Sequence, residues 1–339
     1  MTYLMVLGGL ILLFIGGEAL VRGSVSVARK LNISELVIGL TLVGFGTSVP
    51  ELVTSLRAIG QDAVGIAVGN VVGSNIANIL LVLGLAAVIR PILTNPRALA
   101  RDGMIMLAVT ALLCALIWFD MFTRPVGIGL LGLLLAYLTY SFIADQRRGS
   151  EAAAMHAAEG EVVEAHYGLV VGLLIALGGL VGVILGARLL VDGGVVIARD
   201  LGISETVIGL TIVAVGTSLP ELVTSVVAAY RGKSDVALGN VIGSNIFNVL
   251  GILGVTAVVH PFTLRGDIAV EAMSQGRASS IISSTDIGAL ILSVFLLMLF
   301  AMTGKRIARW EGAVLLLAYV LYFGLLFDLI PVPGIIPYG

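Results

Sequence analysis

Residues 31–78 read LNISELVIGLTLVGFGTSVPELVTSLRAIGQDAVGIAVGNVVGSNIAN, and residues 201–248 read LGISETVIGLTIVAVGTSLPELVTSVVAAYRGKSDVALGNVIGSNIFN. The two stretches lie 170 residues apart, and 29 of their 48 positions are identical. Apolar composition shared by two unrelated segments does not produce so many identities in one register. The chain is therefore built from an internal repeat, with one copy of this stretch in each half.

The composition around the repeat indicates a membrane protein. Of the 339 residues, 58% are hydrophobic and 12% are charged, and the mean hydropathy is +1.11. A soluble domain of this size carries roughly a quarter charged residues, so the apolar sequence exceeds what a soluble core could bury. The net charge of −2 favours no nucleic-acid partner, and the single cysteine, Cys114, excludes an internal disulfide.

A membrane-spanning helix needs about 20 mainly apolar residues. Ten segments of the chain meet this requirement, and we expect each to span the bilayer as a helix. They are 3–21, 35–58, 64–89, 99–119, 124–143, 167–190, 205–230, 236–259, 284–302 and 309–328.

The repeat and the spans together predict the domain organisation. The first five-helix repeat is expected at 1–144, a polar linker at 145–166 and the second repeat at 167–339. Because each half has an odd number of spans, the second copy enters the membrane from the opposite side. The predicted fold is an all-α membrane protein of ten transmembrane helices in two inverted five-helix repeats. Such a plan is common in secondary transporters, which hold substrate between the halves and expose it to each side alternately.

The distribution of basic residues predicts the orientation. Loops on the linker's side of the membrane, with their flanks, carry 13 Lys and Arg residues, and the other side carries 6. By the positive-inside rule the linker is expected in the cytoplasm and both termini outside, in the inner (cell) membrane.

The first motif inside each repeat is GTSVPE at 46–51 and GTSLPE at 216–221. A proline removes one helical hydrogen bond, so Pro50 and Pro220 are expected to break their spans and release backbone carbonyls. Released carbonyls at membrane depth are tolerated where they line a cavity or meet a ligand. The glutamate after each proline costs roughly 2.5–3.5 kcal/mol at mid-bilayer, and a bound cation is the counter-charge that we expect.

The second motif is GNVVGSNIAN at 69–78 and GNVIGSNIFN at 239–248. Its serine and its last asparagine are four residues apart and share one helix face. Carboxylates, carbonyls, amides and hydroxyls form the all-oxygen set that Ca²⁺ prefers, and no His or Cys is near to favour a softer metal. Two carboxylates balance one divalent ion or two monovalent ions.

Other polar residues of the repeats have less specific expectations. The remaining asparagines of the second motif are expected to hold the broken helices together, although a ligand role is also open; they are Asn70, Asn75, Asn240 and Asn245. The hydroxyls that follow the glutamates either satisfy their own helix backbone or bind ions; they are Thr54, Ser55, Thr224 and Ser225.

These paired motifs resemble the alpha-repeats of the sodium/calcium exchanger family, in the cation/calcium antiporter superfamily, and the resemblance covers essentially the whole chain. It implies a secondary active antiporter that exchanges Na⁺ for Ca²⁺ by alternating access, with no enzymatic activity and no cofactor. It further implies a monomer in the lipid bilayer. The implied ligands are Glu51 and Glu221 for both ions, the main-chain oxygens of Thr47 and Thr217 for Ca²⁺, the hydroxyls of Ser48, Ser74, Ser218 and Ser244 for Na⁺, and Asn78 and Asn248 at the centre.

This chain departs from the resemblance at one position, because close prokaryotic relatives often carry Asp where it has Asn248. The same position is acidic in the potassium-dependent branch, so two charges rather than three disfavour coupling to K⁺. An alternative function is a Ca²⁺/H⁺ antiporter on the same fold, although that branch typically reads GNxPE in place of GTSxPE. A passive cation channel would not need inverted halves. An intramembrane hydrolase is disfavoured because no histidine lies inside a span.

Overall fold

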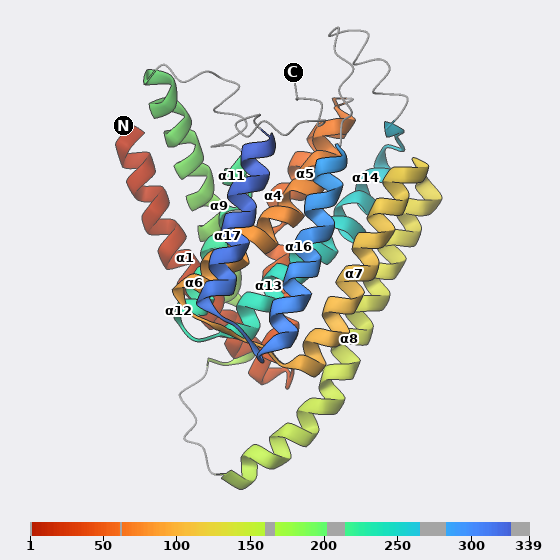
Figure 1. Ribbon diagram of the computed structural model, residues 1–339. Helices are drawn as coiled ribbons and strands as arrows, with labels where there is room; N and C mark the ends of the chain where they lie inside the picture. Colours follow the sequence, from red (N-terminus) through yellow and green to blue (C-terminus); the bar gives the residue numbers. More distant parts are fainter. Residues whose placement is uncertain (1, 62, 160–166, 202–213, 265–282, 327–339) are drawn as a thin grey trace, which may run out of the picture. The chain divides into compact units, whose positions relative to one another are not determined.

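The computed structural model describes residues 2–61, 63–159, 167–201, 214–264 and 283–326. These residues are almost entirely helical (Figure 1). They divide into two compact units, each of which is described by itself: unit 1 comprises Met1–Pro50 and Ala136–Ser244, and unit 2 comprises Glu51–Leu135 and Asn245–Gly339. Each unit therefore takes segments from both halves of the chain, and the divisions at 50/51 and 244/245 fall inside the two motifs.

Unit 1 contains the following elements: α1 (Thr2–Lys30), α2 (Glu35–Ile38), the π-helix η1 (Gly39–Val43), α3 (Gly44–Thr47), α9 (Leu169–Asp200), α11 (Ala214–Thr217), α12 (Leu219–Tyr230) and most of α13 (Ser234–Phe247). Unit 2 contains most of α4 (Val49–Ile59), α5 (Val64–Ala77), the π-helix η2 (Asn78–Leu83), α6 (Gly84–Ile89), β1 (Ile92–Leu93), α7 (Pro96–Phe119), the π-helix η4 (Asn248–Ile252), α14 (Leu253–Val259), α16 (Ser284–Thr303), β2 (Arg306–Ile307) and α17 (Arg309–Leu326). Helix α8 (Arg124–Glu159) belongs in part to each unit and continues into the predicted linker.

The predicted spans agree with these helices. Among the described residues, eight helices are long and apolar enough to cross a membrane, and a pair broken at Ser48 makes a ninth span. The remaining expected span, 205–230, the seventh in chain order, begins within 202–213, outside the described residues, and its second part is α12. Large apolar side chains such as Leu4 and Phe14 are more than 60% exposed on the outer face of α1, which suits contact with lipid.

Helices α1 and α9 occupy equivalent positions in the two repeats, and they pack along their lengths in unit 1 (Figure 1). Glycines bring the two backbones together. A Cβ added at Gly9 would lie 2.8 Å from the carbonyl oxygen of Gly186, and one added at Gly179 would lie 2.3 Å from the backbone nitrogen of Leu20. Small residues permit such close approach, which drives helix association where the solvent is lipid.

The register of this pair shows that equivalent helices run in opposite directions. Along α1, Gly9 meets Gly186, whereas Gly16, one heptad later, meets Gly179, one heptad earlier on α9. An offset of 170 residues converts the first contact into the second, because it carries residue 9 to 179 and residue 16 to 186. The contacts therefore obey a local two-fold relation, as two inverted copies of one helix require.

Both helices are longer than the sequence predicts, since α1 was expected to end near residue 21 and α9 near residue 190. Arg22 remains helical because its guanidinium bonds to Glu18, one turn earlier, and Glu18 also pairs with Arg231 at 2.7 Å. Ion pairs thus let charged residues extend an apolar helix beyond its hydrophobic segment.

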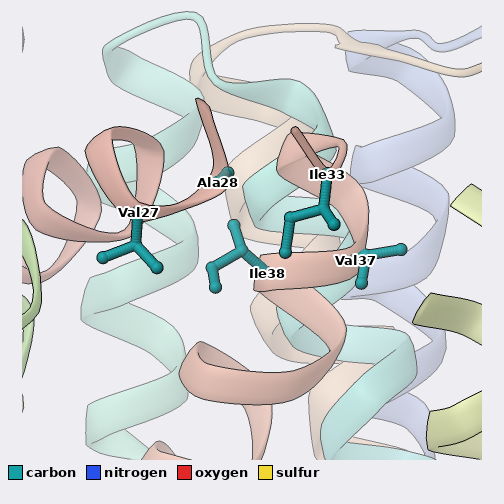
Figure 2. Packing of buried hydrophobic residues seen from close by; sticks show 5 residues of the cluster. All are labelled: Val27, Ala28, Ile33, Val37 and Ile38. Carbon is teal, nitrogen blue, oxygen red and sulfur yellow. The ribbon is translucent and has the colours of Figure 1, made fainter. Parts of the chain in front are cut away.

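The end of α1 packs against the start of α2 through apolar side chains. Val27 and Ala28 contact Ile33, Val37 and Ile38, and all five residues are buried (Figure 2). The Ser34 side chain accepts a hydrogen bond from the backbone N–H of Val37 at 3.3 Å and so caps α2. This short connection positions the chain that leads into the first GTSxPE motif.

Contacts between loops agree with the predicted sidedness. In unit 1, the Asp145 carboxylate accepts from the backbone N–H of Ser34, and Lys233 pairs with Glu35 at 2.9 Å. In unit 2, β1 pairs antiparallel with β2. Each contact joins segments that the span order places on the linker's side of the membrane.

Loops expected on the opposite side also meet within unit 2. The backbone N–H of Phe262 donates to the carbonyl of Phe122 at 3.2 Å, and the two rings stack with centroids 4.6 Å apart. The order of the spans that the sequence predicts is therefore consistent with every one of these pairings.

Candidate functional site

The first motif breaks its span in both copies, as predicted. Ser48, between α3 and α4, has φ −84° and ψ 7°, and Ser218, between α11 and α12, has φ −88° and ψ 5°. These values leave the α-helical region for the bridge region, where many active-site residues lie. Each proline stands in the first turn of the helix that follows, where its missing N–H is no loss.

Each glutamate of the motif therefore lies in the first turn of a helix: Glu51 in α4 and Glu221 in α12. The partial positive charge at a helix N-terminus stabilises a carboxylate there. The sequence carries this signal as S-x-P-E, the spacing of a capping box. Ser218 is the N-cap of α12, yet its hydroxyl makes no capping bond.

The Glu221 side chain is buried in unit 1, at 1% relative exposure. Its Oε1 accepts a hydrogen bond from the Ser48 hydroxyl at 2.9 Å, which joins the GTSxPE motifs of the two repeats. Its Oε2 is buried and has no hydrogen-bond partner. No described arginine or lysine forms an ion pair with Glu221. One carboxylate oxygen is thus left for a cation.

Asn240 of α13 holds the backbone beside Glu221. Its Nδ2 donates to the main-chain carbonyl of Glu221 at 3.2 Å and to the Ser225 hydroxyl oxygen at 2.8 Å. Its Oδ1 lies 3.1 Å from the Thr47 hydroxyl, which can donate to it. This asparagine fixes the first turn of α12 to α13 and to the first repeat.

Asn70 of α5 makes the equivalent bonds in unit 2. Its Nδ2 donates to the main-chain carbonyl of Glu51 at 3.1 Å and to the Ser55 hydroxyl oxygen at 3.0 Å. The expectation that such asparagines hold the broken helices together is confirmed. The Ser55 hydroxyl donates to the carbonyl of Ala67 on the neighbouring helix at 3.3 Å, and so it does not satisfy the backbone of its own helix.

Asn78 and Asn248 are both 1% exposed in unit 2, and each begins a π-helix, η2 and η4 respectively. Single π-helical turns within α-helices are frequent at functional sites. The Nδ2 of Asn78 donates to Asn245 Oδ1 at 3.1 Å, and that of Asn248 donates to Asn75 Oδ1 at 3.0 Å. Both Oδ1 atoms of Asn78 and Asn248 are buried without a hydrogen-bond partner.

The serines of the second motif are held differently in the two copies. The Ser244 hydroxyl donates to the carbonyl of Gly44 at 3.0 Å, across to the first repeat. The Ser74 hydroxyl donates to the carbonyl of Asn70, in its own helix. In both cases the proton is used and the lone pairs of the oxygen can still face a cation.

The ten predicted ligands divide between the units. Unit 1 contains Thr47, Ser48, Thr217, Ser218, Glu221 and Ser244, and unit 2 contains Glu51, Ser74, Asn78 and Asn248. Within the described ranges no group of three or more His, Cys, Asp or Glu side chains is placed to hold a metal. The predicted ligand set is of a different kind, because it combines two carboxylates with neutral oxygens.

Comparison with known proteins identifies the family of the chain. A family model described as sodium/calcium exchanger protein matches residues 1–143 and 171–327. The chain is 36% identical to the sodium/calcium exchanger MaX1 of Methanosarcina acetivorans, over 96% of this chain and 98% of that protein. It is 33% identical to the inner membrane protein YrbG of Escherichia coli, with 96% of each covered.

A solved structure of the sodium-calcium exchanger NCX_Mj, soaked with 10 mM Na⁺ and no Ca²⁺, is similar with a TM-score of 0.77. The identity is 36%, and the match covers 94% of this chain and 97% of that one. The chain belongs to the sodium/calcium exchanger family. Its fold is that of the family, with ten transmembrane helices in two inverted repeats.

This membership confirms several predictions. The exchanger is a multi-pass membrane protein and a transporter rather than an enzyme. Its class is cation/Ca²⁺ antiport, and the family transports Na⁺ and Ca²⁺ without a cofactor.

Proposed function

We propose that this exchanger couples the movement of Ca²⁺ to a counter-flow of Na⁺ by alternating access. The observation that carries the proposal is that each unit has buried oxygens without donors: Glu221 Oε2 in unit 1, and Asn78 Oδ1 and Asn248 Oδ1 in unit 2. A buried acceptor left without a partner costs about 1–3 kcal/mol, and more when charged. A hard cation such as Ca²⁺ is coordinated by oxygen atoms, so a bound cation would satisfy these acceptors.

The proposed ligands are the ten residues predicted from the motifs. Glu51 and Glu221 supply the charge, and Asn78 and Asn248 supply neutral amide oxygens. The serine hydroxyls and the threonine main-chain oxygens complete the set. Two carboxylates neutralise one Ca²⁺ or two Na⁺, so one set of oxygens can be loaded by either ion in turn.

Sodium is favoured as the counter-ion by the hydroxyl residues that precede the glutamate in each copy of the first motif. Both copies read GTSxPE, which places a hydroxyl beside the carboxylate, and Ser48 donates such a bond to Glu221. Hydroxyl oxygens are suitable ligands for a hard monovalent cation, and a proton would need none of them.

The experiment is ⁴⁵Ca²⁺ uptake into liposomes that contain the purified full chain. An outward Na⁺ gradient should drive uptake, and an ionophore that collapses the gradient should stop it. A proton gradient alone, with no Na⁺ present, should drive none. Uptake driven by protons alone would identify a Ca²⁺/H⁺ antiporter, and flux without any counter-ion would identify a channel. Empty liposomes serve as the control.

The proposal extends to organisation and location. The two repeats are 1–144 and 167–339, joined by a cytoplasmic linker at 145–166, with both termini outside the cell membrane and a monomer as the transporting unit. The excess of basic residues on the linker's side supports this orientation. Single cysteines at the N-terminus and in the linker, in a Cys114→Ala background, should react and not react, respectively, with a maleimide that cannot cross the membrane of intact cells.

A further inference from the structure

Four asparagines from the two repeats form a reciprocal set of hydrogen bonds in unit 2. The Nδ2 of Asn75 donates to the main-chain carbonyl of Asn245 at 3.3 Å, and the Nδ2 of Asn245 donates to that of Asn75 at 3.3 Å. The Nδ2 of Asn78 donates to Asn245 Oδ1, and the Nδ2 of Asn248 donates to Asn75 Oδ1. An offset of 170 residues converts each bond into its counterpart, so the set obeys the symmetry of the repeat.

The direction of these bonds is fixed by the backbone. A main-chain carbonyl only accepts, so the side chains of Asn75 and Asn245 must turn their Nδ2 toward it. The second proton of the Asn245 amide points to the Met106 sulfur at 3.9 Å, which is also an acceptor. An amide with its nitrogen held in this way has its Oδ1 on the other side.

This direction is passed on to Asn78 and Asn248. Because Asn245 Oδ1 is an acceptor, Asn78 satisfies it only by presenting Nδ2, and Asn248 does the same for Asn75 Oδ1. The carbonyl end of each amide is therefore turned away from the bond. Those two Oδ1 atoms are the buried ones without a partner.

We propose that Asn75 and Asn245 are positioning residues that hold the amides of Asn248 and Asn78, respectively, with their carbonyl oxygens toward the transported cation. This inference rests on the proposed function. Each repeat thereby orients the central ligand of the other repeat. Without the bond an amide can rotate and present its N–H₂, which repels a cation, in place of its oxygen.

The first test is Asn245→Leu, which removes the amide at nearly constant volume. The main-chain carbonyl of residue 245 survives, so Asn75 keeps its own bond and Asn248 keeps its orientation. Loss of a residue that orients a metal ligand typically lowers affinity by about 10–100-fold. Equilibrium ⁴⁵Ca²⁺ binding to the purified full chain in detergent should show a fall in this range. Asn75→Leu should act in the same way through Asn248.

A crossed double-mutant experiment separates positioning from general destabilisation. In an Asn78→Ala background, Asn245→Leu should change Ca²⁺ affinity by less than about threefold, because the ligand that it orients is already gone. In an Asn248→Ala background, the same substitution should retain its full effect. Asn75→Leu should give the converse pattern. The two backgrounds are matched controls, since they are equivalent positions of the repeat.

The outcomes are distinguishable. Saturable Ca²⁺ binding by the wild type with the crossed pattern supports the inference. Binding by the wild type with equal effects of Asn245→Leu in both backgrounds overturns it, because a merely structural role acts on either background alike. No saturable binding by the wild type overturns the proposed function and the inference with it. If the leucine variants do not elute as folded monodisperse protein, Asn245→Ala and Asn75→Ala remove the same amides without added bulk and enter the same cycle.

Discussion

Each unit of the exchanger joins equivalent segments of the two repeats, but the two junctions are chemically opposite. In unit 1, α1 meets α9 through glycines, backbone against backbone. In unit 2, the second motifs of the two repeats meet through the side-chain amides of Asn75 and Asn245, which form reciprocal hydrogen bonds. Both junctions obey the same two-fold relation between residues 170 apart.

The chemical difference between the two junctions indicates that the glycine junction serves packing, whereas the asparagine junction serves ion binding. A glycine contact constrains distance and carries no polarity, so it stabilises the pair without selecting any ligand. The asparagine contact constrains distance and direction together, and it leaves two buried oxygens unsatisfied. We expect changes in the first junction to alter stability, and changes around the second to alter ion binding.

The largest expected effect tests whether the glutamate of each GTSxPE motif contributes charge to ion transport. Asn70 and Asn240 hold Glu51 and Glu221 by equivalent bonds. Glu51→Gln and Glu221→Gln should therefore each lower Ca²⁺ transport by roughly 100-fold, the equivalent of about 3 kcal/mol for a lost buried charge. Initial rates of Na⁺-driven ⁴⁵Ca²⁺ uptake measure this, with equal protein in each liposome sample. Full activity in either variant would show that the substituted glutamate supplies no essential charge.

The next effect tests the glycine junction. Gly179→Leu should destabilise the fold by about 2 kcal/mol, since overpacking costs 1–3 kcal/mol and the new side chain would meet the backbone of Leu20. Gly178→Leu is the matched control, because, apart from its chain neighbours and the nearby backbone of its own helix, no described atom lies within 4 Å of a Cβ at Gly178. Thermal unfolding in detergent compares the two variants. Equal melting temperatures would contradict the close approach of α1 and α9.

A smaller effect is expected from a charge added to the asparagine junction. In Asn248→Asp, the carboxyl can donate to Asn75 Oδ1 only while it is protonated. When it ionises at higher pH, two acceptors face each other, and uptake should fall by about tenfold, the equivalent of a 1.4 kcal/mol loss. The pH profile of Na⁺-driven uptake, compared with that of the wild type, measures this. Superimposable profiles would show that position 248 is not bonded to Asn75.

The smallest effect concerns the two hydrogen bonds that the Asn240 side chain donates beside Glu221. Ser225→Ala removes the hydroxyl that accepts from Asn240 at 2.8 Å, but the bond from Asn240 to the Glu221 carbonyl remains. The expected cost is about 1 kcal/mol of stability, with Ca²⁺ affinity nearly unchanged. Thermal unfolding and ⁴⁵Ca²⁺ binding on the same preparation check both parts. A large loss of Ca²⁺ affinity would mean that the Ser225 hydroxyl contributes to ion binding and does more than accept the bond from Asn240.

The repeats were the part of the fold that the sequence predicted best. Pro50 and Pro220 predicted the breaks at Ser48 and Ser218, because a missing N–H has the same consequence in any helix. The predicted end of α1 was wrong, and of the two ion pairs that Glu18 makes beyond it, the one with Arg231 depends on the tertiary structure. The end of α9 was also wrong, because its helix continues to Asp200.

The sequence predicts which residue types could form the candidate site, but it does not predict how their side-chain amides are oriented. Residue types alone selected oxygens, because Glu, Asn, Ser and Thr recur twice in one register. The π-helical turns that begin at Asn78 and Asn248 have no sequence signature. The orientation of an amide depends on which partner accepts from it, and for Asn75 and Asn245 that partner is a backbone carbonyl 170 residues away in the chain.

The central claim is that one carboxylate from each repeat binds the same transported cation. Crystals of the exchanger soaked in Sr²⁺, a calcium substitute with strong anomalous scattering, test it most directly. We predict one anomalous peak with carboxylate oxygens of both Glu51 and Glu221 about 2.3–2.6 Å away, the range of calcium–oxygen bonds. A peak bound by only one of the two glutamates, or no peak beside either, would contradict the claim.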